Sequence, residues 1–130
     1  TFLLEEPESN MHPALQSKLA DLFTDAHYKF GSKFIIETHS EHLIKGLQIL
    51  TAKHYLKPDL KREIHPSLST DDSVIYYFND VKYVNENEPK IVKIEITENG
   101  NLTDTFGKGF IDVATSTQFE LLQLNNAQTN

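Results

Sequence analysis

Two short apolar runs in this chain end in side chains that could act on a phosphate group. Residues 2–4 are followed by the carboxylates Glu5 and Glu6, and residues 34–36 lead through one more acid to His39. Adjacent carboxylates at the end of a buried strand cost free energy unless a cation or hydrogen bonds compensate them, and a divalent metal is the simplest compensation. Phosphoryl transfer needs a cation, a group that positions water and a donor near the terminal phosphate. Glu5, Glu6 and His39 together could supply all three.

The elements around these runs predict a parallel βαβ unit. Residues 2–5 and 33–37 have the short apolar pattern of buried strands. Asn10 is a suitable N-cap for a helix that begins at residues 11–13, and Gly31 is a suitable stop. Between them, apolar residues recur at helical spacing: Leu15, Leu19, Leu22, Phe23, Ala26 and Phe30. Because strands joined by one helix run parallel, both strand ends should meet at one edge of the sheet, where open α/β folds bind ligands.

The next part of the chain predicts a second helix and then a connector. Residues 43–50 carry Leu and Ile at helical spacing, and this helix should pack back on the sheet. The apolar period is lost over residues 53–72, which contain two prolines and mixed charge. We interpret that stretch as a connector.

The last part has the character of a small β region. Residues 74–78 and 91–96 are rich in β-branched and aromatic side chains, and Asn99-Gly100 indicates a tight turn. A final helix is expected over residues 113–124. The predicted fold class is therefore α/β, with a parallel βαβ unit followed by a β-hairpin and a helix. The expected division is an N-terminal unit over 1–52, a connector over 53–72 and a small α+β domain over 73–130.

Composition restricts the class of protein. The chain has 130 residues, enough for one domain with a real core, and its net charge of −7 argues against a generic nucleic-acid binder. Cys is absent, which excludes disulfides and thiolate metal sites. No apolar stretch approaches the roughly 20 residues that span a bilayer, and no signal peptide is visible, so we expect a soluble cytoplasmic protein. Because the chain begins at Thr1 on the edge of a strand, we interpret it as a piece of a longer protein.

The two motifs resemble the C-terminal half of ABC-class ATPases. The first reads Phe-Leu-Leu-Glu-Glu-Pro-Glu-Ser-Asn-Met-His-Pro-Ala-Leu-Gln and the second Ile-Ile-Glu-Thr-His-Ser-Glu-His-Leu. Within that class they are most similar to the AAA-type group of the overcoming-lysogenization-defect, RecF and structural-maintenance-of-chromosomes ATPases, which have a P-loop NTPase fold. The resemblance covers residues 1 to about 50. Residues 74–124 look similar to a small C-terminal domain of unknown function that is appended to some of these ATPases.

The resemblance implies a role for each matching residue. The first strand corresponds to the Walker B motif, in which Glu5 would hold Mg²⁺ through water and Glu6 would orient or deprotonate the attacking water. Many relatives have Asp where this chain has Glu5. His39 corresponds to the switch histidine that contacts the γ-phosphate of ATP. The stretch 9–16 corresponds to the D-loop, which crosses a dimer interface towards the opposite nucleotide. Its candidate nucleotide contacts are Ser9, Asn10 and His12.

Other parts of such an ATPase are absent from this sequence. No phosphate loop of the G-x-x-x-x-G-K-Ser/Thr type and no Leu-Ser-Gly-Gly signature occurs in the 130 residues. The resemblance therefore implies an N-terminal ATPase segment as a partner, hydrolysis of ATP between two head domains, and no activity of this piece alone. It also implies a role in DNA repair or phage defence, with DNA or an associated nuclease as a further partner. Because flanking strands are missing, exposed sheet edges should favour a homo-oligomer.

Two alternatives remain open at this point. A metal-dependent nuclease or phosphoesterase could use Glu5, Glu6, Glu37 and His39, because two-metal sites need several carboxylates. A non-catalytic module could bind a partner protein through residues 74–124. Glu8 has a simpler interpretation, since an acid there could favour the following helix N-terminus by charge–dipole attraction.

Overall fold

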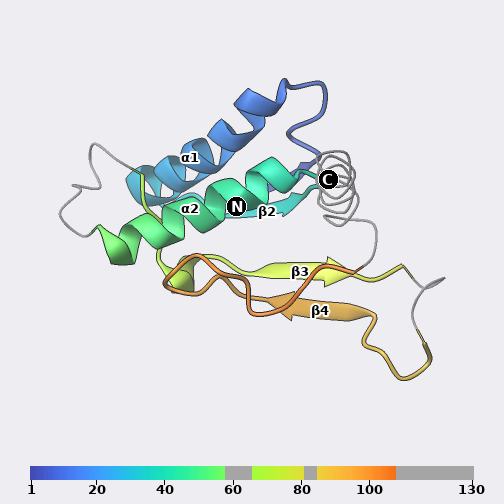
Figure 1. Ribbon diagram of the computed structural model, residues 1–130. Helices are drawn as coiled ribbons and strands as arrows, with labels where there is room; N and C mark the ends of the chain where they lie inside the picture. The colour runs from blue at the N-terminus through green and yellow to red at the C-terminus, as the bar shows by residue number, and fades with distance from the viewer. Residues whose placement is uncertain (58–65, 81–84, 108–130) are drawn as a thin grey trace, which may run out of the picture.

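The computed structural model describes residues 1–57, 66–80 and 85–107. Within these residues the chain is an α/β structure in which two helices accompany two small sheets (Figure 1). The elements are β1 (Phe2–Glu5), α1 (Pro13–Phe30), β2 (Phe34–Glu37), α2 (Glu41–Leu56), the short 3-10 helix η1 (Thr70–Asp72), β3 (Ile75–Phe78) and β4 (Ile91–Ile94). The helix expected over 113–124 lies outside the described residues. Neither long helix in the described part has the length and apolar character that crossing a bilayer requires.

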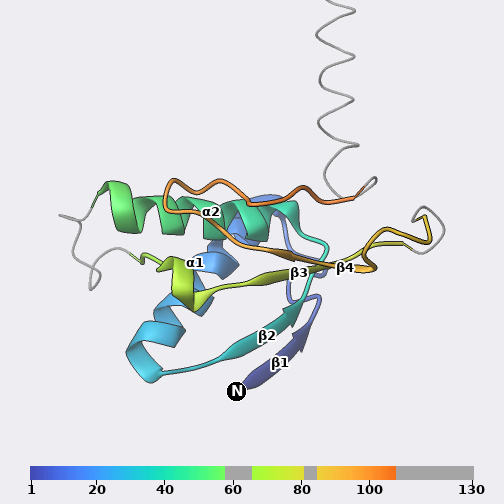
Figure 2. The same ribbon diagram turned by 90° about the horizontal axis from the view of Figure 1, so that it is seen from below.

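The β1–α1–β2 unit confirms the predicted parallel βαβ arrangement. Phe2 pairs with Phe34 and Glu5 pairs with Glu37, in parallel register. The carboxyl ends of both strands therefore lie at the same edge of the sheet, as Figure 2 shows for the two arrowheads. This arrangement brings the residues after Glu5 close to those after Glu37.

Helix α1 begins at Pro13, within the predicted range of residues 11–13, but its N-cap is not the predicted residue. Its N-cap is His12, whose Nδ1 accepts a hydrogen bond from the Ala14 backbone N–H at 3.2 Å. The prediction that Asn10 caps the helix is wrong, because Asn10 lies in the preceding turn with a left-handed φ of 63°. Pro13 explains the start, since its fixed φ and missing N–H suit the first helical position. Gly31 ends the helix as predicted, with φ of 64° and its N–H bonded to the carbonyl of His27 at 2.9 Å.

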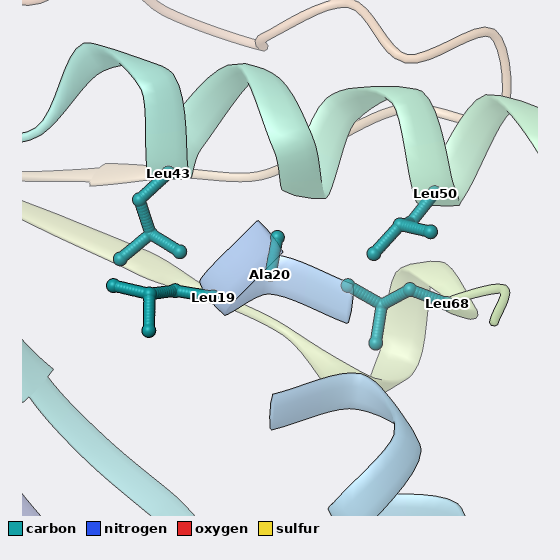
Figure 3. Close-up of a cluster of buried hydrophobic side chains, with 5 residues drawn as sticks. All are labelled: Leu19, Ala20, Leu43, Leu50 and Leu68. Carbon is teal, nitrogen blue, oxygen red and sulfur yellow. The ribbon is translucent and has the colours of Figure 1, made fainter. Parts of the chain in front are cut away.

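Helix α2 packs against α1 rather than mainly against the β1–β2 sheet. A buried cluster joins the two helices, with Leu68 closing one end (Figure 3). Its members are Leu19, Ala20, Leu43, Leu50 and Leu68. The expectation that α2 covers the sheet is therefore wrong in the main, although Ile36 of β2 borders this cluster. The helix also continues to Leu56, so the first residues of the expected connector are helical.

The other side of α2 contacts the second sheet. Strands β3 and β4 pair antiparallel, as predicted, and Ile44 of α2 packs with Ile94 and Phe106. The tight turn after β4 is also confirmed, since the Gly100 N–H bonds to the carbonyl of Thr97 at 2.8 Å. Helix α2 thus lies between α1 and the β3–β4 sheet (Figure 1).

One face of the β1–β2 sheet is open. On the covered face, Phe34 packs against Phe23 of α1 with ring centroids 5.0 Å apart. On the other face, Leu3 is 79% exposed and Ile35 is 61% exposed. The prediction of two buried strands is therefore wrong for this face within the described residues. A parallel sheet is normally covered on both sides, so these apolar side chains are suited to contact with further protein.

Candidate functional site

The residue after β1 redirects the chain at the edge of the sheet. The Glu6 N–H donates to the carbonyl of Glu37 at 2.8 Å, which extends the ladder by one bond. Its φ of 41° is left-handed, a conformation that costs a non-glycine residue about 1–3 kcal/mol and is concentrated at functional sites. From there, the Glu6 Oε1 lies 3.6 Å from the Nε2 of His39. This separation is too long for a hydrogen bond, so both atoms can still bind a ligand.

A shallow hollow of about 280 Å³ lies beside this pair. It is lined by Glu6, Glu8, Ser9, Asn10, Gln16, His39 and Ser40. Of the six residues that the sequence assigned to a site, four are therefore brought together: Glu6, Ser9, Asn10 and His39. All four come from the segments that follow β1 and β2.

Glu5 and His12 do not line the hollow. Glu5 is the last residue of β1 and lies opposite Glu37, on an exposed part of the strand end. Glu6 lies beyond the end of β1 with a left-handed φ of 41°, so the chain changes direction between Glu5 and Glu6. His12 uses its Nδ1 to cap α1. That contact gives His12 a local structural task.

Sequence reasoning missed the contacts of Glu8. Its side chain is only 8% exposed, and its Oε1 accepts hydrogen bonds from the Thr38 hydroxyl at 2.5 Å and from the His39 N–H at 2.9 Å. Burial raises the pKa of Glu8, but hydrogen bonds from the Thr38 hydroxyl and from nearby backbone N–H groups lower it by more. The net pKa lies below the ordinary value of 4.5, so Glu8 is a buried carboxylate at neutral pH.

Gln16 is a second residue whose contacts were not predicted from the sequence. Its Oε1 accepts a hydrogen bond from the Ser40 hydroxyl at 2.7 Å, and its Nε2 donates to the carbonyl of Met11 at 3.1 Å. The same Ser40 oxygen caps α2 by accepting from the Leu43 N–H at 3.2 Å. The start of α1 is thereby tied to the start of α2. A polar residue one turn into a helix was the only signal for this contact.

The donor set restricts the kind of metal site. Among the residues that the structure describes, no group of three or more His, Asp or Glu side chains is placed to hold a metal ion. Mg²⁺ is usually bound through one or two carboxylates, with waters and substrate phosphates completing its coordination. Glu6 at the hollow and Glu5 at the adjacent strand end are the carboxylates available to such an ion, and water and phosphate oxygens would have to supply its other ligands.

Comparison with protein families finds two matches along the chain. Residues 1–45 match a family described as an AAA domain, putative AbiEii toxin, of type IV toxin–antitoxin systems. These residues are therefore similar to a segment of an AAA domain. Residues 68–121 match a family of proteins of unknown function, DUF3696. No curated protein and no solved structure matches the chain.

The two matches confirm the resemblance found in the sequence. The AAA segment, residues 1–45, contains β1, α1, β2 and the first turn of α2, and thus every residue that lines the hollow. The β3–β4 sheet lies in the second match. The predicted division at 52 and 72 stays a prediction.

Proposed function

We propose that the AAA segment supplies the water-activating and phosphate-contacting groups of an ATP-hydrolysing site. The observation that supports this most directly is the pair formed by Glu6 and His39. A carboxylate and an imidazole lie 3.6 Å apart beside a hollow, at the carboxyl ends of two parallel strands. Open α/β sheets bind ligands at this edge.

Each group has a role that fits its position. Glu6 orients the attacking water and accepts its proton, which is the task of a general base. His39 donates a hydrogen bond to the terminal phosphate of ATP, where negative charge develops. Glu5 holds Mg²⁺ through water at the strand end. When bound, Mg²⁺ neutralises charge on the phosphate oxygens.

The complete site requires groups from other segments. A phosphate loop would come from another part of an ATPase, because the 130 residues contain none. Ser9 and Asn10 border the hollow and are exposed to solvent, so they are proposed to contact the nucleotide of a partner head. The proposed setting is an assembly of two heads that acts in DNA repair or phage defence.

The test replaces Glu6 in a protein that joins the AAA segment to a phosphate loop. Glu6→Gln keeps the shape of the side chain and removes the base. We expect kcat for Mg²⁺-dependent ATP hydrolysis to fall at least about 100-fold, the lower range for loss of general base catalysis, while ATP binding is retained. Turnover that stays at the wild-type rate would contradict the proposal.

Glu37→Gln is the matched control. Glu37 ends β2 at the position paired with Glu5, but it does not line the hollow. We expect its kcat to stay within about twofold of wild type. The alternative of a metal-dependent nuclease would be favoured if the protein cleaved DNA with Mn²⁺ in the absence of nucleotide and lost this cleavage in both Glu6→Gln and Glu37→Gln.

A further inference from the structure

The buried carboxylate of Glu8 connects the two segments that form the hollow. Both of its hydrogen bonds go to the turn that carries His39, one to the Thr38 hydroxyl and one to the His39 N–H. We infer that Glu8 is a positioning residue, which sets the place of the His39 imidazole at the site. This inference rests on the proposed function of His39.

The hydrogen bonds of Glu8 restrain the backbone of His39, to which the imidazole is attached. The Oε1 atom accepts at 2.5 Å from the residue before His39 and at 2.9 Å from the N–H of His39 itself. Hydrogen bonds to an ionised carboxylate are short and about twice as strong as neutral ones. A displacement of this turn would therefore change the separation between His39 and Glu6.

The simpler interpretation, that Glu8 stabilises the N-terminus of α1, does not fit the structure. The helix begins at Pro13, has no acidic residue in its first turn and is capped by His12. The side chain of Glu8 instead reaches across to the segment after β2. Its Oε2 is buried and has no hydrogen-bond partner in the described part of the chain, so the identified hydrogen bonds of this side chain all go to that turn.

The burial of the Glu8 carboxylate is explained by the two donors that it binds. An isolated buried charge is costly, and an apolar side chain could fill the same space without that cost. An ionised acceptor, however, can bind a hydroxyl and a backbone N–H together. The turn after β2 offers both donors at adjacent residues, and a carboxylate at this position can accept from both.

The restraint extends from Glu8 to the start of α2. Thr38 Oγ1 accepts a hydrogen bond from the Ser40 N–H at 3.0 Å, and Ser40 is the N-cap of α2. Ser40 in turn donates to Gln16 of α1. The segment that carries Ser9 and Asn10 is thus bonded to the turn of His39 at two places. A movement of one segment should therefore displace the other.

The test is a double-mutant cycle in the ATP-hydrolysing protein that carries the AAA segment. Glu8→Gln removes the charge, Thr38→Val removes the hydroxyl with little change in shape, and Thr38→Ser keeps the hydroxyl. We expect about a tenfold loss of kcat in E8Q and in T38V with KM for ATP within about twofold, because the phosphate loop binds most of the nucleotide. The loss in the double variant should be smaller than the sum of the two single losses, because both substitutions remove the same bond between Glu8 and Thr38. T38S should recover most of the kcat lost in T38V.

A second readout separates this inference from the proposed function. The backbone amide proton of His39, observed by NMR after selective ¹⁵N-histidine labelling, should move upfield in E8Q and T38V as its acceptor weakens or shifts. If Glu6→Gln leaves turnover intact but E8Q lowers kcat and moves the His39 amide, the positioning of His39 by Glu8 stands and the proposed role of Glu6 fails. If Glu6→Gln abolishes turnover while E8Q changes neither kcat nor the amide, the positioning role is overturned. Losses that add in the double variant also overturn it. Should E8Q not fold, T38V and T38S carry the same comparison.

Discussion

The crossing of α1 and α2 depends on the absence of a side chain at Gly46. A β-carbon there would lie 2.7 Å from the Cβ of Ala20 and 3.1 Å from the carbonyl oxygen of Ser17. Neither neighbour can rotate away, because one is itself a β-carbon and the other is backbone. Gly46→Ala must therefore push the two helices apart or strain them.

Two opposing terms set the expected size of the effect. Ala is favoured over Gly in a helix interior by about 1 kcal/mol. Overpacking a tight core costs about 1–3 kcal/mol, and a contact of 2.7 Å between two β-carbons belongs at the upper end of that range. We therefore expect Gly46→Ala to lower the free energy of unfolding by about 1–2 kcal/mol.

Urea unfolding followed by circular dichroism measures this change, with Ala20→Gly as the companion variant. Ala20→Gly removes the opposing β-carbon, so Gly46→Ala should be less harmful in that background than alone. The coupling between the two sites should amount to about 1 kcal/mol or more, as is found for residues in contact. A Gly46→Ala variant that is as stable as wild type, or more stable, would show that helix propensity prevails and that the crossing is not tight.

Two further predictions concern the contacts of Glu8 and Ser40. Burial raises the pKa of Glu8, but its hydrogen bonds lower it by more, to a net value below 4.5, so its ionised form favours the folded state. The difference in unfolding free energy between wild type and Glu8→Gln should be constant above about pH 5 and should decrease as the pH falls through the pKa of Glu8 in the folded protein. Urea unfolding at a series of pH values measures this difference. An increase of the difference on acidification would contradict the prediction. Ser40→Ala loses the cap on the Leu43 N–H and the bond to Gln16, and should cost about 1–2 kcal/mol in urea unfolding. Ser40→Asp keeps the cap and should cost less, and equal stability of the two variants would oppose this reasoning.

The elements that were predicted correctly have local causes. Both strands of the first sheet follow from short apolar runs, and α1 ends at Gly31 because the left-handed conformation suits a residue without a β-carbon. The parallel pairing follows from one helix joining two strands. It brought Glu6 and His39 together, as expected from their positions after the two strands.

The errors came from a local choice between competing signals and from long-range packing. Asn10 was predicted as the N-cap from its residue type, but Pro13 occupies the first helical position and makes His12 the cap. The exposure of Leu3 and Ile35 could not be read from their apolar character, because burial depends on what covers a sheet. Likewise, α2 could have packed on the sheet or on α1. Gly46 permits the close approach to α1 that the structure adopts.

The contacts around Glu8 depend on tertiary structure and could not be predicted from local sequence pattern. Residue order alone was sufficient for the strands, for the parallel pairing and for the resemblance to an AAA-type ATPase, because each depends on neighbours within one element or one motif. The bonds of Glu8 to Thr38 and of Gln16 to Ser40 join residues 30 and 24 positions apart. Such pairs have no periodic signature, since either partner could equally have faced solvent. Only the folded arrangement, which buries Glu8 beside two donors, makes those bonds more favourable than bonds to water.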